Sequence, residues 1–354
     1  MKYLRVLLLP LSLLYGLVVA VRNWLYDTGF YKSKEFKFPV ISVGNLEVGG
    51  AGKTPMTEYL IRLFKDDLRV ATLSRGYGRV TTGYLTAATN TNATTVGDEP
   101  AQFKHKFPEV RVAVSEDRVY GIERLRPTVD VIIMDDAYQH RAVKPGFSIL
   151  LFDYNKLRSP HFMLPAGDLR EPFSGRWRAD ILIATKCPSD LSEQAQSELT
   201  DRLRPLSYQQ VFFTGIQYLP LQELSGKVAD VAIDAETEVF LLTGIANPKP
   251  LLQHLQKQST LINHYNYPDH HQFTLKNISK LADAFTACKT QKKCIITTEK
   301  DAQRLGGQDL QPLVAQLPIL VMPIGINFLN DGQPEFDRLV TNYVREYTAN
   351  YAIY

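Results

Sequence analysis

The residues with the clearest capacity for chemistry lie in the segment VGNLEVGGAGKTP (43–55). An apolar run of strand character (38–43) precedes this segment, and a helical pattern (56–64) follows it. Glycines let backbone N–H groups close around phosphate oxygens, and the start of a helix adds its positive dipole end. Lys53 would reach the outer phosphates, while the Thr54 hydroxyl would ligate Mg²⁺. The sequence therefore predicts a phosphate-binding loop formed by Val48, Gly49, Gly50, Ala51, Gly52, Lys53, Thr54 and Pro55.

One position of this loop departs from the common pattern. The first glycine of G-x-x-x-x-G-K-[ST] should stand at position 47, where this chain has Glu47. Gly49 and Gly50 would supply the missing flexibility. The alternative is an ordinary glycine-rich turn with a surface lysine, and the flanking strand and helix weigh against it.

An apolar strand that ends in two carboxylates is the second chemical signal. The segment VIIMDD (131–136) places Asp135 and Asp136 where a carboxylate would hold Mg²⁺ at the end of a strand. Solvated aspartates in a strand-end turn are the alternative. Beside a phosphate loop the magnesium interpretation is favoured, although the pattern does not decide which aspartate contacts the ion directly.

Two further segments carry groups suited to proton transfer. In GDEP (97–100), Asp98 and Glu99 enter a helix, where they could cap it, ligate a metal or act as a base. In DHHQF (269–273), His270 has a side chain that moves protons near neutral pH. A zinc site is disfavoured, because no third ligand has a helpful spacing. The residues alone leave these roles open.

Two loops contain arginines that suit phosphate groups. Arg75 and Arg79 lie in the glycine-spaced segment SRGYGR, and Arg170 lies in LPAGDLREP. Guanidinium groups bind phosphate well, so these residues are candidate contacts to a phosphorylated substrate, with solvated arginines as the alternative. The segment TKCP (185–188) lacks the aspartate of a guanine-reading Asn-Lys-x-Asp motif, which favours ATP over GTP.

The strands and helices that would position these residues alternate along the chain. Six buried runs have strand character: 38–43, 69–73, 110–114, 129–134, 148–152 and 181–185. Helical patterns cover 56–64, 101–106, 119–125 and 192–203. Continuous apolar strands are typical of a parallel sheet covered on both faces. We therefore predict an α/β fold with a mostly parallel sheet of the P-loop NTPase kind and helices on both faces.

The N-terminus has a composition of its own. Residues 6–21 carry no charge, and basic residues flank them. This run is short for a membrane span and is interrupted by Pro10 and Gly16. A signal peptide has a similar charge pattern, but a secreted chain would meet no ATP. We predict a helix that lies in the membrane interface, with a helix covering the domain core as the alternative.

Composition limits the remaining function classes. The net charge of +3 over 354 residues does not argue for nucleic acid, and three cysteines without C-x-x-C spacing fit neither disulfides nor zinc. Near position 211 the alternation changes, and a second set of strands and helices begins after it. We predict an N-terminal membrane-associating helix (1–28), a P-loop domain (29–210), a strand connector (211–235) and a smaller C-terminal α/β domain (236–354).

Taken together, the motifs resemble the tetraacyldisaccharide 4′-kinase family, the lipid A 4′-kinases of Gram-negative bacteria. The matching segments are 44–55, 74–79, 97–100, 135–141, 164–172, 243–248, 269–273 and 297–305. They occur in order over nearly the whole chain, which makes the joint match far more specific than any one motif. Ala137 and Tyr138 depart from the Gly-Phe that the family often has, a change expected to alter packing rather than chemistry.

The resemblance implies a definite activity. Such kinases transfer the γ-phosphate of ATP to the 4′-hydroxyl of a tetraacylated glucosamine disaccharide 1-phosphate and form lipid IVA. The implied partners are this lipid and the inner-membrane surface, with no nucleic acid or protein partner. The implied location is the cytoplasmic face of the inner membrane, with peripheral or monotopic attachment.

The resemblance also assigns roles to residues. Lys53 and Thr54 would bind phosphate and Mg²⁺, and Asp135 and Asp136 would serve the metal. Asp98 would act with His270 in deprotonating the sugar hydroxyl when the domains close, and Glu99 would be a further metal contact. A nucleotide-driven switch and a soluble kinase for a small sugar or cofactor are the alternatives from other classes.

Overall fold

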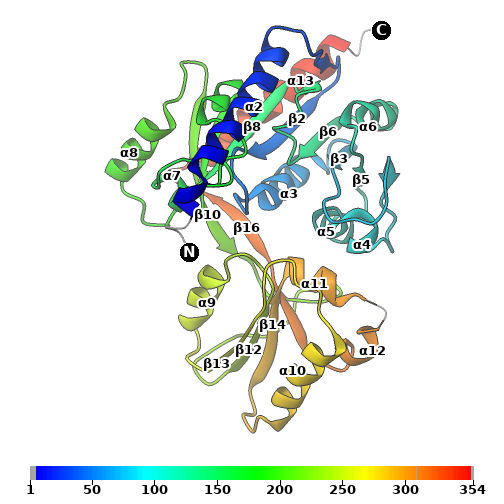
Figure 1. Ribbon diagram of the computed structural model, residues 1–354. Helices are drawn as coiled ribbons and strands as arrows, with labels where there is room; N and C mark the ends of the chain where they lie inside the picture. The colour runs from blue at the N-terminus through cyan, green and yellow to red at the C-terminus, as the bar shows by residue number, and fades with distance from the viewer. Residues whose placement is uncertain (1–4, 308, 352–354) are drawn as a thin grey trace.

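The structure is a computed structural model that describes residues 5–307 and 309–351. A nine-stranded sheet forms the core of a larger body, and a five-stranded sheet forms a smaller one (Figure 1). Residues 1–4 of the predicted N-terminal helix and 352–354 of the predicted C-terminal domain lie outside the described residues. The mostly parallel sheets with their helices confirm the predicted α/β fold class.

The larger sheet carries the predicted phosphate loop. Its strands, in spatial order, are β16 (Ile324–Phe328), β10 (Gln210–Tyr218), β9 (Ile181–Thr185), β8 (Phe147–Asp153), β2 (Val40–Asn45), β6 (Val131–Asp135), β3 (Val70–Ser74), β5 (Arg111–Val114) and β4 (Leu85–Thr86). The strands from β10 to β5 pair in parallel with their neighbours, whereas β4 and β16 join antiparallel at the edges. Every residue of β2 and β6 is buried, which explains why these strands are continuous apolar runs.

Helices cover both faces of the larger sheet. They are α2 (Leu9–Asp27), α3 (Lys53–Phe64), α4 (Ala93–Val96), α5 (Asp98–Lys106), α6 (Arg118–Leu125), α7 (Tyr154–Leu157), α8 (Glu193–Leu203) and α13 (Gly332–Tyr351). Short elements are η1 (Val6–Leu8), β1 (Lys34–Glu35), η2 (Arg126–Thr128), β7 (Val143–Lys144) and η3 (Phe173–Arg178). Met56 and Leu60 of α3 pack in one apolar layer, while Ile122 and Leu125 of α6 pack in the layer across the sheet.

The smaller body repeats the α/β pattern. Its sheet has the order β11 (Gln222–Glu223), β15 (Ile319–Met322), β14 (Lys293–Thr298), β12 (Glu238–Thr243) and β13 (Ile262–Asn266). Its helices are α9 (Lys249–Gln256), α10 (Leu275–Ala287), α11 (Glu299–Leu305) and α12 (Gln311–Val314). The sequence did not predict β13, because Asn263, His264 and Asn266 are polar, with both asparagines exposed and His264 only partly buried.

Two strands join the bodies. Residues 210–213 of β10 pair in parallel with β9, and residues 214–218 then pair antiparallel with β16. The two strands run between the bodies side by side (Figure 1). The predicted connector therefore has a second strand, β16, which returns from the smaller sheet.

The end of the chain corrects the predicted C-terminal domain (236–354). Residues 324–351 do not belong to the smaller body, because β16 extends the larger sheet and α13 packs on it. Phe336, Val340 and Tyr343 recur at helical spacing on one face of α13, and this face is buried in the core of the larger body. The Tyr343 hydroxyl donates to Val40 O at 3.1 Å, which ties α13 to β2.

Helix α2 contacts the larger body through one narrow face. Ser12 and Val19 are its only buried residues among those described, and Tyr15 donates to Arg170 O at 2.9 Å. Leucines and valines of the opposite face are exposed, with exposed fractions of 61% at Leu14 and Leu17. By length and composition α2 could cross a membrane, although only 11% of the relevant window is buried against protein. The alternative that α2 serves to cover the core therefore finds little support in its burial.

Candidate active site

The phosphate loop connects β2 to α3 in a conformation that depends on glycine. Gly49 and Gly52 have φ values of 97° and 87°, in the left-handed region that other residues rarely adopt. Backbone N–H groups of Gly50, Gly52 and Lys53 donate to no protein atom within the described residues. These donors at the start of α3 form an anion-binding arrangement.

Side chains from α7 and from the end of β9 hold the carbonyl groups of this loop. Lys156 Nζ donates to Val48 O at 2.5 Å, and Lys186 Nζ donates to Gly50 O. Thr185 Oγ1 donates to Ala51 O at 2.9 Å. Because these carbonyls are already bound, the loop is fixed before any phosphate arrives.

The two aspartates at the end of β6 lie beside this loop but differ in environment. Lys53 Nζ lies 3.5 Å from Asp136 Oδ1, and Arg170 Nη2 lies 2.9 Å from the same oxygen. Burial alone would raise the pKa of Asp136, but the two cations outweigh it and hold that pKa below its usual value. Asp135 is fully buried and accepts from Thr57 Oγ1 at 3.1 Å. Burial, followed by the charges of Asp136 and Glu99, raises the pKa of Asp135 to about 7.

These residues fit a magnesium ion. Asp135, Asp136 and the Thr54 hydroxyl supply the oxygen donors that Mg²⁺ prefers. Burial and the neighbouring carboxylates disfavour the charged form of Asp135, and a divalent cation beside it would favour that form. Among the described residues, no three His, Cys, Asp or Glu side chains form a metal-binding group. An ion here would therefore need phosphate oxygens or waters as further ligands, as in nucleotide sites.

The predicted proton-transfer pair is brought together across the two bodies. Asp98 begins α5 in the larger body, whereas His270 follows β13 in the smaller one, and His270 Nδ1 lies 3.1 Å from Asp98 Oδ2. A Cβ at Gly97 would lie 2.9 Å from Tyr77 O, so only glycine allows this helix start to approach the SRGYGR loop. Sequence segments that are far apart thus form one constellation.

Arg304 completes this constellation, and the sequence analysis gave it no role. Its Nη2 and Nε atoms donate to Asp98 Oδ2 at 2.6 and 3.1 Å, and its Nη1 donates to Asp301 Oδ1 at 3.0 Å. Burial alone would raise the pKa of Asp98, but Arg304 and then His270 outweigh it and lower that pKa. Asp98 is therefore a firmly ionised carboxylate. Arg304 lay in the matched segment 297–305, but no spacing rule links it to Asp98.

Ion pairs extend along the contact between α5 and α11. Lys300 Nζ lies 2.6 Å from Glu99 Oε1, and Lys106 pairs with Glu299 as well as with Glu58 at 2.5 Å. Glu99 thus neutralises a lysine of the smaller body. The prediction that Glu99 also contacts the metal stays a prediction, although its charge influences the pKa of Asp135.

The three predicted substrate arginines have different surroundings. Arg170 binds Asp136 and Asn45, beside the phosphate loop. Arg79 pairs with Glu116, and only 2% of its side chain is exposed. Arg75 is exposed, and its side chain has no hydrogen bond or ion pair within the described residues. Arg75 is thus the most accessible of the three to an incoming anion.

Two buried groups near Arg75 have unpartnered nitrogens. Arg118 Nε and His140 Nε2 are buried without a hydrogen-bond partner within the described residues. Burial and then the charge of Arg75 lower the pKa of Arg118 to about 10. Burial and then Arg118 lower the pKa of His140 to about 4, so His140 is neutral at physiological pH. The adjacent Tyr138 packs inside the protein and donates to Gly175 O at 2.7 Å, in keeping with a packing role.

The sequence closely matches a family of lipid kinases. The family model described as LpxK, tetraacyldisaccharide-1-P 4′-kinase, matches residues 4–345. A tetraacyldisaccharide 4′-kinase of Flavobacterium johnsoniae is 45% identical over 350 residues, covering 98% of this chain and 99% of that protein. A protein of the same name from Bacteroides thetaiotaomicron is 44% identical over 362 residues, covering 97% and 94%.

A solved structure shares the fold over nearly the full length. The crystal structure of LpxK from Aquifex aeolicus, described as an "apo" form in complex with ATP, has a TM-score of 0.73 and 29% sequence identity. The match covers 96% of this chain and 99% of that one. Both bodies and their connection therefore have a counterpart of known structure.

Proposed function

The chain belongs to the tetraacyldisaccharide-1-P 4′-kinase family, and we propose that it transfers the γ-phosphate of ATP to the 4′-hydroxyl of a tetraacyldisaccharide 1-phosphate, forming lipid IVA. One observation carries this assignment to particular residues. Asp98 and His270 come from different bodies and meet 3.1 Å apart, next to a nucleotide half that contains Lys53 and Asp135.

The nucleotide half positions and neutralises the triphosphate. The free N–H groups of the loop bind phosphate oxygens, and Lys53 reaches the outer phosphates from its place beside Asp136. Asp135, Asp136 and Thr54 would hold a magnesium ion, which supplies positive charge to the phosphates. Phosphoryl transfer depends mainly on such positioning and charge neutralisation.

The interdomain half of the site, formed by Asp98, His270 and Arg304, accepts the proton of the sugar hydroxyl. In a loose transition state this proton is lost late, so a carboxylate of low pKa can still accept it. Asp98 is that acceptor, and His270 orients it at 3.1 Å. Arg304 is a positioning residue, because it holds the carboxylate from the smaller body and keeps it ionised.

The anionic end of the acceptor needs positive charge outside the nucleotide half. Arg75 has an accessible guanidinium, and Arg118 and His140 have buried nitrogens without partners. Bound phosphate or sugar oxygens would satisfy these groups, since unpaired buried donors are costly. We assign this cluster to acceptor binding, whereas Arg79 supports the loop through Glu116.

Helix α2 brings the enzyme to its lipid substrate. Its exposed face of leucines, valines and Trp24 suits the boundary between head groups and acyl chains. Its opposite face is tied to the site, because Arg22 donates to Gln139 O and Asn23 donates to Glu171 Oε1 at 2.7 Å. We place the enzyme on the cytoplasmic face of the inner membrane, where ATP is available.

The decisive assay measures phosphate transfer with and without the acceptor. Purified full-length chain, Mg-ATP and micellar tetraacyldisaccharide 1-phosphate should give a 4′-phosphorylated lipid and little ATP hydrolysis without lipid. Lys53→Ala should reduce transfer by about 10³-fold through lost phosphate stabilisation. The exposed Lys280→Ala on α10 is the matched control and should leave the rate unchanged. Equal ATP hydrolysis with and without lipid would contradict the kinase assignment and favour a nucleotide switch.

A further inference from the structure

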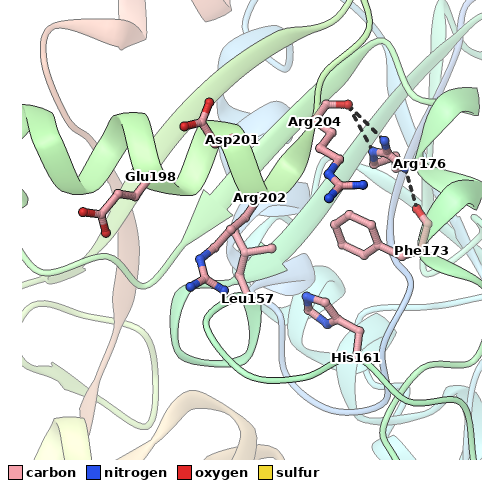
Figure 2. Close-up of a pocket in the computed structure, with 8 residues that line it drawn as sticks. All are labelled: Leu157, His161, Phe173, Arg176, Glu198, Asp201, Arg202 and Arg204. Carbon is pink, nitrogen blue, oxygen red and sulfur yellow. Dashed lines mark hydrogen bonds between the residues drawn. The ribbon is translucent and has the colours of Figure 1, made fainter.

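An open pocket of about 550 Å³ lies away from the catalytic constellation, between α7, η3 and the end of α8. Three arginines line it: Arg176, Arg202 and Arg204. Figure 2 shows these side chains around the pocket, with His161 and Phe173 on its lower side. We call these three residues and the space between them the arginine pocket.

The arginine pocket brings three positive charges together, and two carboxylates, Glu198 and Asp201, also line it. The side chains of Arg202 and Arg204 have no hydrogen bond or ion pair within the residues that the structure describes. Arg176 is held in place, because its Nε donates to Leu203 O at 2.6 Å and its Nη2 donates to Arg204 O at 3.1 Å. Burial and then the charge of Arg204 lower the pKa of Arg176, which reflects the repulsion between the two groups.

The backbone has an unusual conformation at Arg204, at the end of α8. Arg204 caps α8 with a φ of 47°, in the left-handed region where helix ends usually carry glycine. The two carboxylates of the lining, Glu198 and Asp201, point away from the arginine head groups in the view of Figure 2. Glu198 accepts from Gln194 Nε2 at 3.2 Å on its own helix. The pocket thus keeps the guanidinium groups of Arg202 and Arg204 available to an anion from outside.

Aromatic side chains connect this pocket with helix α2. Trp177 and Tyr208 have exposed fractions of 45% and 55%, and Tyr208 donates its hydroxyl to Trp177 O. Trp177 also lines a second cavity, of about 190 Å³, together with Ala20 and Trp24 of α2. Tryptophan and tyrosine are the residues that favour the membrane–water interface. Trp177 directly follows Arg176, which lines the arginine pocket, so one short segment contributes to both the pocket and the cavity beside α2.

We propose that the arginine pocket binds the phosphate group of an anionic glycerophospholipid in the membrane on which α2 lies. Planar guanidinium groups bind phosphate oxygens in pairs, so Arg202 and Arg204 suit one phosphodiester, with the positive charge of Arg176 beside them. The proposal rests on the proposed membrane docking of α2 and adds a second point of attachment. An apolar helix can rotate about its own axis, whereas a helix and a charged pocket together fix which face of the enzyme meets the bilayer.

The test compares vesicle binding of the full chain with that of a double variant, Arg202→Gln with Arg204→Gln. Vesicles of phosphatidylcholine alone measure binding through α2, and vesicles that also contain phosphatidylglycerol measure the anionic contribution. Each basic residue near an anionic surface changes binding about fivefold, so the double variant should lose about 25-fold on the anionic vesicles. Binding to phosphatidylcholine should stay unchanged.

A charge-matched control separates the pocket from net charge. Lys276→Gln with Lys280→Gln removes two exposed charges from α10 in the smaller body and should leave vesicle binding unchanged. Equal losses in the two double variants would overturn the proposal. Calorimetry with inorganic phosphate covers the other source of the same anion: saturable binding that depends on Arg202, combined with unchanged vesicle binding, would overturn the lipid assignment.

Failure of the membrane docking itself gives a different result. In that case the intact chain would not bind phosphatidylcholine vesicles, while its transfer activity on micellar substrate would persist. The double variant should keep that micellar activity, since neither arginine contacts the catalytic constellation. Loss of binding to the anionic vesicles alone, with normal micellar turnover, would therefore support the arginine pocket and exclude misfolding.

Discussion

The nucleotide half of the site and its interdomain half are built from different kinds of contact. In the nucleotide half, the phosphate loop and Asp135 follow β2 and β6, neighbouring strands of one sheet. Its side chains are mostly buried, and lysines hold the loop through backbone carbonyls. In the interdomain half, Asp98 meets His270 and Arg304 across 172 and 206 residues of chain, and 47% of the His270 side chain is exposed.

This difference separates nucleotide binding from chemistry. Lys53, Asp135 and Asp136 all belong to the larger body, so we expect the nucleotide half to bind ATP whatever the position of the smaller one. The interdomain half exists only while α5 and α11 are in contact, and the two strands β10 and β16 are the link that permits movement. Under the proposed function, such an arrangement would limit ATP hydrolysis in the absence of the lipid, because the proton acceptor would be held correctly only on closure.

Among the variants that test this separation, those that break the interdomain half should have the largest effect. Asp98→Asn and Arg304→Gln should each lower kcat by about 10²-fold, because each disrupts the proton acceptor, and both should leave the KM for ATP nearly unchanged. The double variant should be hardly worse than either single one, since the two residues act as a unit. Rates of lipid phosphorylation and ATP binding by calorimetry measure the two halves separately.

Two outcomes would contradict this separation. If the losses in kcat multiply in the double variant, Asp98 and Arg304 act independently. If ATP binding weakens by the same factor as kcat, the interdomain half is also part of the nucleotide site. A thermal melt of each variant controls for unfolding, because Arg304 is buried beside Asp301 and its loss leaves that carboxylate without its partner.

A smaller effect should come from loosening the nucleotide half. Lys186 donates to Gly50 O and lies 2.8 Å from Asp153 Oδ2, so it fixes the loop from the end of β9. Lys186→Met should raise the KM for ATP roughly tenfold with a much smaller change in kcat, the cost of one partly exposed charge-assisted hydrogen bond. Lys186→Arg should recover part of the affinity. An unchanged KM for ATP in Lys186→Met would show that the loop needs no such support.

The same contrast explains how much the sequence could predict. The phosphate loop, the aspartates of β6 and the buried strands were predictable, because each is a contiguous pattern with a defined spacing. Arg304 was not, since its partner Asp98 lies in another body and no local pattern records a contact between bodies. The return of β16 and α13 was missed for a similar reason: their apolar residues fit any α/β core, and only packing decides which sheet they join.

The residue types alone also could not distinguish the roles of Arg75 and Arg79. Arg75 and Arg79 lie four positions apart in one loop, with the same head group and the same glycine neighbours. In the structure Arg79 is buried against Glu116, whereas Arg75 faces solvent. The partner Glu116 lies 37 residues away, so the loop sequence could not assign one arginine to support and the other to ligand.

The smallest expected effect is a pH dependence that should belong to the nucleotide half alone. Burial, Asp136 and Glu99 raise the pKa of Asp135 from 3.8 to about 7, so the folded state binds a proton that the unfolded state does not between these values. Stability should therefore fall as pH rises from about 4 to 7 in the absence of metal. Asp98 has the opposite sign: its lowered pKa contributes stability that is lost only as pH falls below its ordinary 3.8.

Thermal unfolding with a chelator at pH 5 and pH 7.5 isolates this contribution as the difference between the intact chain and Asp135→Asn. The variant should be more stable than the intact chain at pH 7.5, by roughly 2–4 °C in Tm, and should lose that advantage at pH 5. Mg-ATP should cancel the difference by neutralising Asp135 in the intact chain. His140 titrates in the same interval with opposite sign, but it is present in both proteins and drops out of the comparison. An advantage of the variant that stays the same at both pH values would mean that Asp135 remains charged throughout, and that the cation is needed for catalysis but not to relieve this carboxylate.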